Sequence, residues 1–252
     1  MDASKAEERY ALHVLYLSFD QDWAPEWATR DLTDALSAAG LAGTLFVTHD
    51  CPSLSALRAS GHIELGWHPN FLPGSSHGDT VDEVLETMAR WVPEAVGARA
   101  HTLMRGTPLL TAYRSRGLRY DAADIFDGRA GLEAFESWTG MLRLPIWFED
   151  DVHLERGLPC ELSGLDLQSP GLQICTFHPV LVALNASNLS TYRALKSDLA
   201  SRGVGLTDAT REDFARHRQD EEPGIEDLFR ALIHWLKDRP ERQGGHLKSL
   251  CE

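Results

Sequence analysis

Short apolar runs alternate along this chain with stretches of helical periodicity, and this alternation limits the possible folds more than any other feature. An apolar run of about four to eight residues bounded by turn residues is typical of a buried strand, and leucines three or four positions apart indicate a helix packed against it. The expected strands are 13–20, 44–48, 63–67, 101–105, 118–122, 142–148 and 172–177. The expected helices are 29–39, 53–61, 80–91, 190–200 and 225–237. Repeated strand–helix units of this kind predict an α/β fold with a mainly parallel sheet.

The number of expected strands bears on the architecture of that sheet. About seven strands in 252 residues fit a distorted (β/α)7 barrel, closed or nearly closed, better than a flat doubly wound sheet. No repeat or low-complexity linker interrupts the pattern, so residues 1–238 are expected to form a single domain. Residues 239–252 are rich in glycine and charge, and we interpret them as a polar, flexible tail.

Charge and hydropathy exclude several classes of partner. Lys and Arg total 24 against 38 Asp and Glu, a net charge of −14 that repels nucleic-acid phosphates and anionic membranes. No window of about 18 apolar residues is present, and residues 1–12 lack the apolar run of a signal peptide. We therefore expect a cytoplasmic protein that does not bind nucleic acid or insert into a membrane.

Ionisable residues follow nearly every expected strand. In folds of this class the functional site lies at the carboxyl ends of the strands, so these side chains are expected to meet in one pocket. A catalytic pocket needs that arrangement, whereas a structural protein does not. The residues concerned are Asp20, Asp22, His68, Arg105, Asp121, Asp124, Glu149, Asp150, Asp151 and His178.

The pair Asp20 and Asp22 indicates metal chemistry. Residues two apart on an extended backbone point to the same face, and two carboxylates so placed repel unless a cation or an arginine lies between them. One can bind a metal while the other remains a general base. His68 and His77 bracket a Pro/Gly-rich loop and can both reach one ion. With an aspartate they would form a three-ligand site with an open position, which activates water and polarises a carbonyl.

Two further residues would complete such a site. His178 ends a strand, and an imidazole there can protonate a leaving amine because its ordinary pKa lies near neutrality. Arg105 can hold a carboxylate through two hydrogen bonds. Simpler interpretations remain open for each residue: aspartates and His77 in solvent, His178 as a core group and Arg105 in a surface ion pair.

At this point the order of motifs resembles a known family, the NodB-homology polysaccharide deacetylases of the fourth carbohydrate esterase family. Five segments match that family's motifs in the same order along the chain. They are Ser18-Phe-Asp-Gln-Asp22, Gly43-Thr-Leu-Phe-Val47, Gly61-His-Ile-Glu-Leu-Gly-Trp-His68, Arg105-Gly-Thr-Pro108 and Phe177-His-Pro179. The resemblance implies a distorted barrel of about seven strands and the removal of an N- or O-acetyl group from a sugar.

The resemblance also assigns roles to individual residues. Asp20 would be the base that activates the attacking water, and Arg105 would orient it. His178 would be the general acid. Asp22 and His68 would hold a metal, which in the family is usually zinc, with Co²⁺, Ni²⁺ or Fe²⁺ as other candidates.

The sequence departs from the family pattern in its first and second motifs. Gln21 separates two aspartates that are normally adjacent, which extended geometry tolerates. The second motif normally has a further histidine four residues after the first, where this chain has Leu72. His77, five residues beyond, is the candidate replacement. The aspartate that would polarise His178 cannot be chosen among Asp121, Asp124, Asp150 and Asp151.

Two other functions remain open from the sequence. A glycosidase that uses carboxylates alone could pair Asp20 with Glu149 or Asp150. A non-catalytic barrel could bind sugar, with tryptophans near the strand ends stacking on its rings; these are Trp23, Trp27, Trp67, Trp138 and Trp147. For a cytoplasmic deacetylase we expect an acetylated sugar, or a nucleotide- or lipid-linked sugar, in the biosynthesis of bacterial surface polysaccharide such as O-antigen lipopolysaccharide or capsule.

Overall fold

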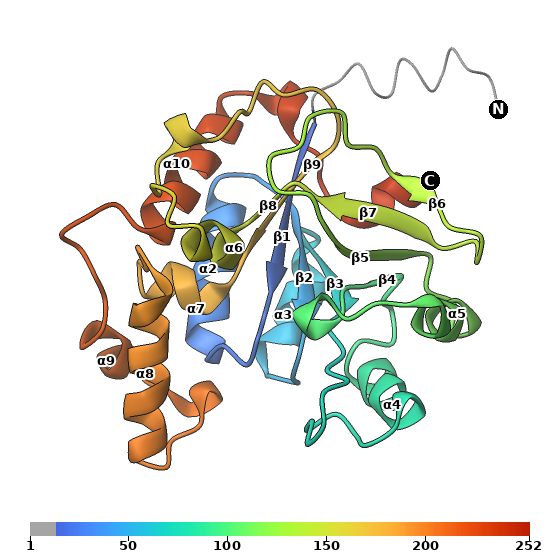
Figure 1. Ribbon diagram of the computed structural model, residues 1–252, viewed down its shortest axis with the longest axis horizontal. Coiled ribbons are helices and arrows are strands. Elements are labelled where there is room, and N and C mark those ends of the chain that lie inside the picture. The colour runs from blue at the N-terminus through green and yellow to red at the C-terminus, as the bar shows by residue number, and fades with distance from the viewer. Residues whose placement is uncertain (1–13) are drawn as a thin grey trace.

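The protein is described from a computed structural model over residues 14–252. The amino-terminal segment that we interpreted as free of a signal peptide, and His13 at the start of the first expected strand, lie outside these residues. Figure 1 shows the strands in the middle of the molecule with helices around them.

The strands within residues 14–252 form one sheet, whose order is β6-β7-β5-β4-β3-β2-β1-β9-β8. Their bounds are β1 Leu15–Asp20, β2 Gly43–Val47, β3 Ile63–Trp67, β4 Gly97–Ala98, β5 Tyr120–Ile125, β6 Phe135–Glu136, β7 Leu142–Ile146, β8 Phe148–Glu149 and β9 Gln173–Phe177. Every neighbouring pair is parallel except β6 with β7. The prediction of an α/β fold with a mainly parallel sheet is therefore confirmed.

Two strands that lie far apart in this order are consecutive in the chain. β7 pairs with β5 and β8 pairs with β9, and only Trp147 separates β7 from β8 in the chain. The backbone N–H of Trp147 donates to the carbonyl of Ile174 in β9 at 2.9 Å. Because all the strands except β6 run parallel to their neighbours, the carboxyl ends of the parallel strands face the same side of the molecule.

Helices and short helical turns connect the strands. The α-helices are α2 Glu26–Ala38, α3 Ser53–Ser60, α4 Val81–Trp91, α5 Thr107–Ser115, α6 Asp150–Glu155, α7 Pro179–Ala183, α8 Leu189–Ser201, α9 Arg211–Ala215 and α10 Ile225–Lys237. The 3₁₀ turns are η1 His101–Leu103, η2 Leu162–Gly164, η3 Leu206–Asp208, η4 Pro240–Arg242 and η5 Leu247–Cys251. The five expected helices correspond to α2, α3, α4, α8 and α10, and the capping box at Thr80 is present.

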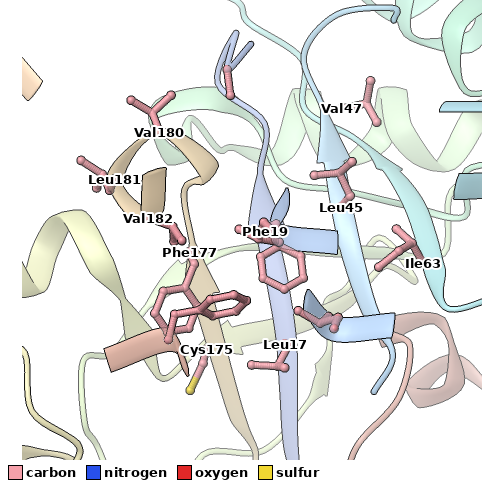
Figure 2. Packing of buried hydrophobic residues seen from close by; sticks show 14 of the residues in the cluster. Leu17, Phe19, Leu45, Val47, Ile63, Cys175, Phe177, Val180, Leu181 and Val182 are labelled. Atoms are coloured by element: carbon pink, nitrogen blue, oxygen red, sulfur yellow. The ribbon is translucent and has the colours of Figure 1, made fainter. Parts of the chain in front are cut away.

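Alternation along the strands divides the core into two parts. Leu15, Leu17 and Phe19 of β1 belong to the large cluster under the helices, whereas Tyr16 belongs to a smaller cluster on the other face of the sheet. Figure 2 shows the large cluster, with side chains of β1, β2 and β9 next to one another. Since successive side chains of a strand point to opposite faces, Ser18 and Asp20 share the face of Tyr16, and this places polar groups on the interior side of the sheet.

The fourth strand lies earlier in the chain than predicted. The strand is Gly97–Ala98, and His101–Leu103, predicted as strand, is a 3₁₀ turn. The reason is steric: a Cβ on Gly97 would lie 1.9 Å from Cζ of Tyr120, so only glycine lets the Tyr120 ring cross this strand. A two-residue strand without a large side chain leaves no periodic signal in the sequence.

The carboxyl-terminal segment is packed against the sheet, which corrects its interpretation as a flexible tail. Leu247 is fully buried in the small cluster with Tyr16 and Tyr120. Its backbone N–H donates to Thr44 Oγ1 at 3.0 Å, and that of Lys248 donates to Glu64 Oε2 at 2.9 Å. The segment thus supplies apolar and polar contacts at the end of the sheet opposite to the strand carboxyl ends. In residues 14–252, no helix is both long and apolar enough to span a bilayer.

Candidate metal and catalytic site

A tight turn directly after β1 directs Asp22 toward the neighbouring strands. Asp22 and Trp23 both have positive φ, 45° and 55°, a region that residues with a Cβ rarely occupy. Gln21 fixes this turn to the end of β2, because its Oε1 accepts hydrogen bonds from the N–H groups of Thr48 (3.0 Å) and His49 (3.1 Å). The residue that separates the two aspartates therefore holds the strained turn in place.

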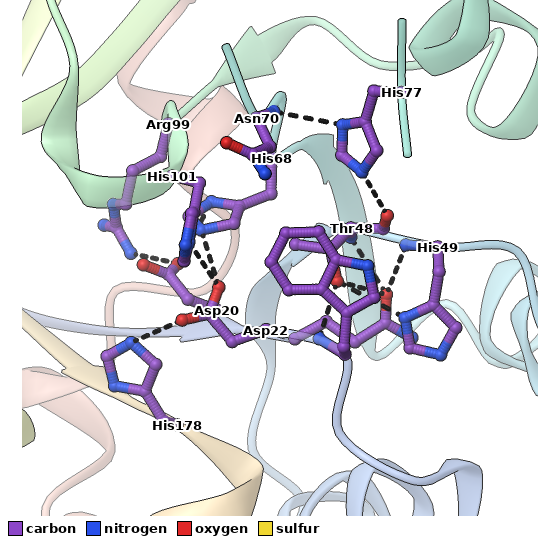
Figure 3. Close-up of polar contacts among 12 residues, drawn as sticks. Asp20, Asp22, Thr48, His49, His68, Asn70, His77, Arg99, His101 and His178 are labelled. Carbon is purple, nitrogen blue, oxygen red and sulfur yellow. Dashed lines mark hydrogen bonds and ion pairs between the residues drawn. The ribbon is translucent and has the colours of Figure 1, made fainter. Parts of the chain in front are cut away.

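Two histidines converge on one oxygen of Asp22 (Figure 3). Nε2 of His68, directly after β3, lies 3.0 Å from Asp22 Oδ1. Nδ1 of His101, in η1 just after β4, lies 2.9 Å from the same oxygen. Burial raises the pKa of Asp22, but the hydrogen bonds from His101 and His68 outweigh it and hold that pKa well below the ordinary value. Asp22 is accordingly an anion facing two imidazoles.

This group has the composition of a three-ligand metal site. One atom each of Asp22, His68 and His101 lie within 4.8 Å of one another. Two imidazole nitrogens and one carboxylate oxygen suit Zn²⁺ and other first-row divalent ions, and three protein ligands leave a position for water or substrate. His68 Nδ1 is buried without a hydrogen-bond partner among residues 14–252 and lies 3.9 Å from Asp20 Oδ1, so its orientation is compatible with metal binding through Nε2.

His77, predicted as the third ligand, is not brought into this group. Its Nδ1 accepts the N–H of Asn70 at 3.0 Å, and its Nε2–H donates to the carbonyl of Thr48 at 2.7 Å. Burial lowers the pKa of His77 to about 4, which keeps the ring neutral with both nitrogens in use. His77 therefore ties the loop after β3 to the end of β2, and His101 is the second histidine next to Asp22.

Asp20 is paired with an arginine other than the predicted one. Arg99, fully buried one residue after β4, donates from Nη1 to Asp20 Oδ1 at 2.8 Å and from Nη2 to Ser18 Oγ at 3.0 Å. Its Nε–H donates to the carbonyl of Ala122 at 2.8 Å, which fixes the guanidinium plane. Arg105, whose side chain is 52% exposed, instead pairs with Asp124 at 3.0 Å. The displaced fourth strand explains the error, because it puts Arg99 at the strand end.

Of the four candidate aspartates, Asp150 is the partner of His178. Its Oδ1 accepts from His178 Nδ1 at 2.6 Å and its Oδ2 from the His178 backbone N–H at 2.8 Å. Burial lowers the pKa of His178, but the charge and hydrogen bond of Asp150 outweigh it and hold the pKa well above its ordinary value. The other nitrogen, Nε2, lies 3.6 Å from Asp22 Oδ2. His178 is thus a protonated imidazole at the edge of the three-ligand group.

The remaining candidate aspartates have other surroundings. Asp121 and Asp124 both pair with Arg143 on β7. Asp151 accepts from the N–H of Val152 within α6 at 2.6 Å. Among these three, only Asp151 has a side chain that groups with Asp150 and His178 within 4.8 Å.

Among the five tryptophans considered from the sequence, Trp23 is the one whose ring contacts a site residue. Its centroid lies 5.1 Å from that of His101 in an edge-on arrangement. Trp67 and Trp147 are buried core residues. Trp27 donates from Nε1 to the carbonyl of Ala209, and Trp138, which is 83% exposed, precedes β7 and lies at the opposite end of that strand from the site. Only Trp23 remains a candidate for contact with a substrate at this site.

Comparison with known proteins gives one family and a set of related structures. The family described as WbmS-like polysaccharide deacetylase matches residues 17–196. A structure from Bordetella bronchiseptica, described as a polysaccharide deacetylase involved in O-antigen biosynthesis, is 28% identical with a TM-score of 0.79 and covers 93% of this chain and 95% of its own. A Mycobacterium smegmatis structure described as a polysaccharide deacetylase is 14% identical with a TM-score of 0.57. The match covers 94% of this chain and 88% of the other, and it supports the fold. No curated protein matches the chain.

Proposed function

The chain belongs to the WbmS-like polysaccharide deacetylase family, and from this we propose that it is a metal-dependent hydrolase that removes an acetyl group from an N-acetylated (or O-acetylated) sugar or sugar precursor. The observation that carries the proposal is the convergence of His68 and His101 on Asp22, with Asp20 next to His68 and His178 next to Asp22. A glycosidase that uses carboxylates alone needs no such pair of histidines.

Asp22, His68 and His101 would hold the metal. When bound, a divalent ion supplies a Lewis acid that polarises the acyl carbonyl and makes water easier to deprotonate. Zn²⁺ fits the donor set best, although Co²⁺, Ni²⁺ and Fe²⁺ accept the same ligands.

Asp20 is suited to take the proton from the attacking water. Arg99 holds Oδ1 and leaves Oδ2 without a partner in that ion pair. A carboxylate that is anchored through one oxygen can accept a proton on the other without a change of position, as general-base catalysis requires.

His178 is suited to protonate the leaving nitrogen or oxygen. Asp150 accepts from Nδ1, so the proton on Nε2 faces the site. Since Asp150 also stabilises the imidazolium, His178 carries this proton at neutral pH. Base and acid lie close to each other, since a carboxylate oxygen of Asp20 and a ring nitrogen of His178 are within 4.8 Å, so both can reach the same acyl group.

The likeness to the Bordetella protein supports a substrate from surface-polysaccharide biosynthesis. The test is release of acetate from a panel of N-acetylamino sugars offered as free sugars, nucleotide-linked sugars and oligomers, after loading with Zn²⁺, Co²⁺ or Ni²⁺. Asp20→Asn should lower kcat by about a hundredfold or more while the metal content stays at the wild-type level. Loss of the metal in Asp20→Asn, or turnover that survives His68→Ala, would contradict the proposed roles.

A further inference from the structure

Glu149 is a buried carboxyl within the site that the mechanism above does not use. It is the last residue of β8, is 3% exposed, and pairs in register with Thr176 of β9. A carboxylate oxygen of Glu149, one of Asp20 and a ring nitrogen of His178 lie within 4.8 Å of one another. Glu149 therefore lies next to both the proposed base and the proposed acid.

One oxygen of the Glu149 carboxyl group lacks a partner that would stabilise a buried anion. Oε2 is buried and has no hydrogen-bond partner among residues 14–252. The side chain does not cap α6, although Glu149 is the residue that precedes this helix. The nearby guanidinium of Arg99 donates instead to Asp20, Ser18 and the carbonyl of Ala122. A buried carboxylate without donors is unfavourable, whereas a neutral carboxyl can donate a hydrogen bond itself.

The charges around Glu149 act in both directions. Asp151 at the start of α6 and Asp20 at the end of β1 oppose its ionisation, whereas His178 after β9 and Arg99 after β4 favour it. Asp150, the other carboxyl next to it in the chain, is directed at His178. Burial has the largest effect and, with Asp151, raises the pKa of Glu149 to about 8.

We propose that Glu149 is a positioning residue of this site that acts in its neutral form, as a hydrogen-bond donor next to Asp20 and His178. The inference rests on the proposed function and deepens it. A neutral carboxyl adds no negative charge to a site that already contains Asp20, Asp22 and Asp150, and it can donate a hydrogen bond to the carboxylate of Asp20. Loss of the proton from Glu149 would add a fourth carboxylate to the site and remove the hydrogen-bond donor. We therefore expect kcat to fall as the pH rises above neutrality.

The first test is the pH dependence of kcat for the zinc-loaded wild type and Glu149→Gln. Glutamine keeps the size and a donor but cannot ionise. The wild type should lose about tenfold in kcat from pH 7 to pH 9, whereas the kcat of the variant, relative to its own value at pH 7, should decline only at a higher pH. The matched control is Glu155→Gln, an exposed carboxylate on the adjacent α6, which should leave the profile unchanged. An alkaline decline at the same pH in Glu149→Gln, or inactivity at every pH, would overturn the proposal.

The second test is independent of turnover. Infrared difference spectra of the protein without substrate, recorded between pH 6 and pH 10, should contain the carbonyl stretch of a protonated carboxyl that disappears as the pH rises and is missing in Glu149→Gln. Absence of this band in the wild type at pH 6 would show that Glu149 is ionised and would overturn the inference. A band that behaves as expected in a protein inactive on every substrate would count against the proposed function alone.

Discussion

His101 and Asp22 are in direct contact, with Nδ1 of the histidine 2.9 Å from Oδ1 of the aspartate, although 79 positions separate them in the chain. The contact joins the strained turn after β1 to the 3₁₀ turn after β4, and His68 reaches the same oxygen from β3. The segments after β1, β3 and β4 therefore each bring one side chain to a single point. The predictions below follow from this point and from the groups around it.

His101→Ala should abolish stoichiometric metal binding. With two protein ligands left, zinc content by elemental analysis should fall from about one per chain to near zero after dialysis against a weak chelator. His234→Ala is the matched control, because His234 is 80% exposed on α10 and its loss should leave the metal content unchanged. Full zinc occupancy in a folded His101→Ala protein would rule out His101 as a ligand.

His77→Ala should have the reverse pattern, with the metal retained and stability reduced. The change leaves the Thr48 carbonyl and the Asn70 N–H, both buried, without their partners, at a cost of about 1 to 3 kcal/mol each. Urea unfolding measures the loss. His77→Gln, which offers both a donor and an acceptor, should recover part of it. If the metal were lost while the fold remained, His77 would be the ligand after all.

Arg99 and Arg105 should differ sharply when substituted. Arg99→Met leaves Asp20 buried without its counter-charge, so the free energy of unfolding should fall by about 3 to 5 kcal/mol and kcat should fall with it. Arg105→Ala removes a half-exposed ion pair, which contributes about 1 kcal/mol or less. Urea unfolding of both variants makes the comparison, and equal losses would contradict the assignment of Arg99 to Asp20.

Glu149 should make the protein less stable as the pH rises. Its pKa is raised from an ordinary 4.5 to about 8 in the folded protein, so the folded state binds the proton more tightly than the unfolded state. The resulting stabilisation is complete below pH 4.5 and is lost between about pH 4.5 and pH 8. The slope is on the order of 1 kcal/mol per pH unit.

Urea unfolding of Glu149→Gln at a series of pH values measures this contribution. The free energy of unfolding of the wild type minus that of the variant should decline between about pH 4.5 and pH 8, since other groups titrate equally in both proteins. A difference independent of pH would mean that Glu149 has an ordinary pKa in the folded state.

Leu247→Ala should destabilise the whole domain although the residue lies near the end of the chain. Leu247 is fully buried against Tyr16 and Tyr120, and truncation of such a leucine costs about 2 to 5 kcal/mol. Lys248→Ala is the control, because its side chain is exposed and its backbone hydrogen bond to Glu64 remains. An unchanged unfolding midpoint for Leu247→Ala would return residues 239–252 to their interpretation as a tail.

Some parts of the site were predictable because they depend on local pattern. Asp20, Asp22, His68 and His178 each follow a strong apolar run, and burial of such runs in parallel strands places the residues after them at one end of the sheet. Hydrophobic periodicity records this burial within a few residues, which is why the α/β class and these four positions follow from the sequence.

The other positions depend on tertiary contacts. β4 has two residues and no apolar pattern, because the Tyr120 ring occupies the space that a side chain at Gly97 would need. The strand was therefore predicted too late in the chain, and neither Arg99 nor His101 was identified as a residue that follows a strand. His77 was an equally good candidate by composition, and only the tertiary structure shows that both of its nitrogens are engaged in hydrogen bonds to the backbone.

The sequence by itself thus determined the fold class, the end of the sheet where the site lies and the residues that follow the regular strands, because periodic burial is a local property of the chain. The tertiary structure decided which histidine, which arginine and which aspartate are in contact at the candidate site, and that the carboxyl-terminal segment is packed rather than free. These choices are pairings across many positions, and the register of the strands and the shape of neighbouring side chains set them.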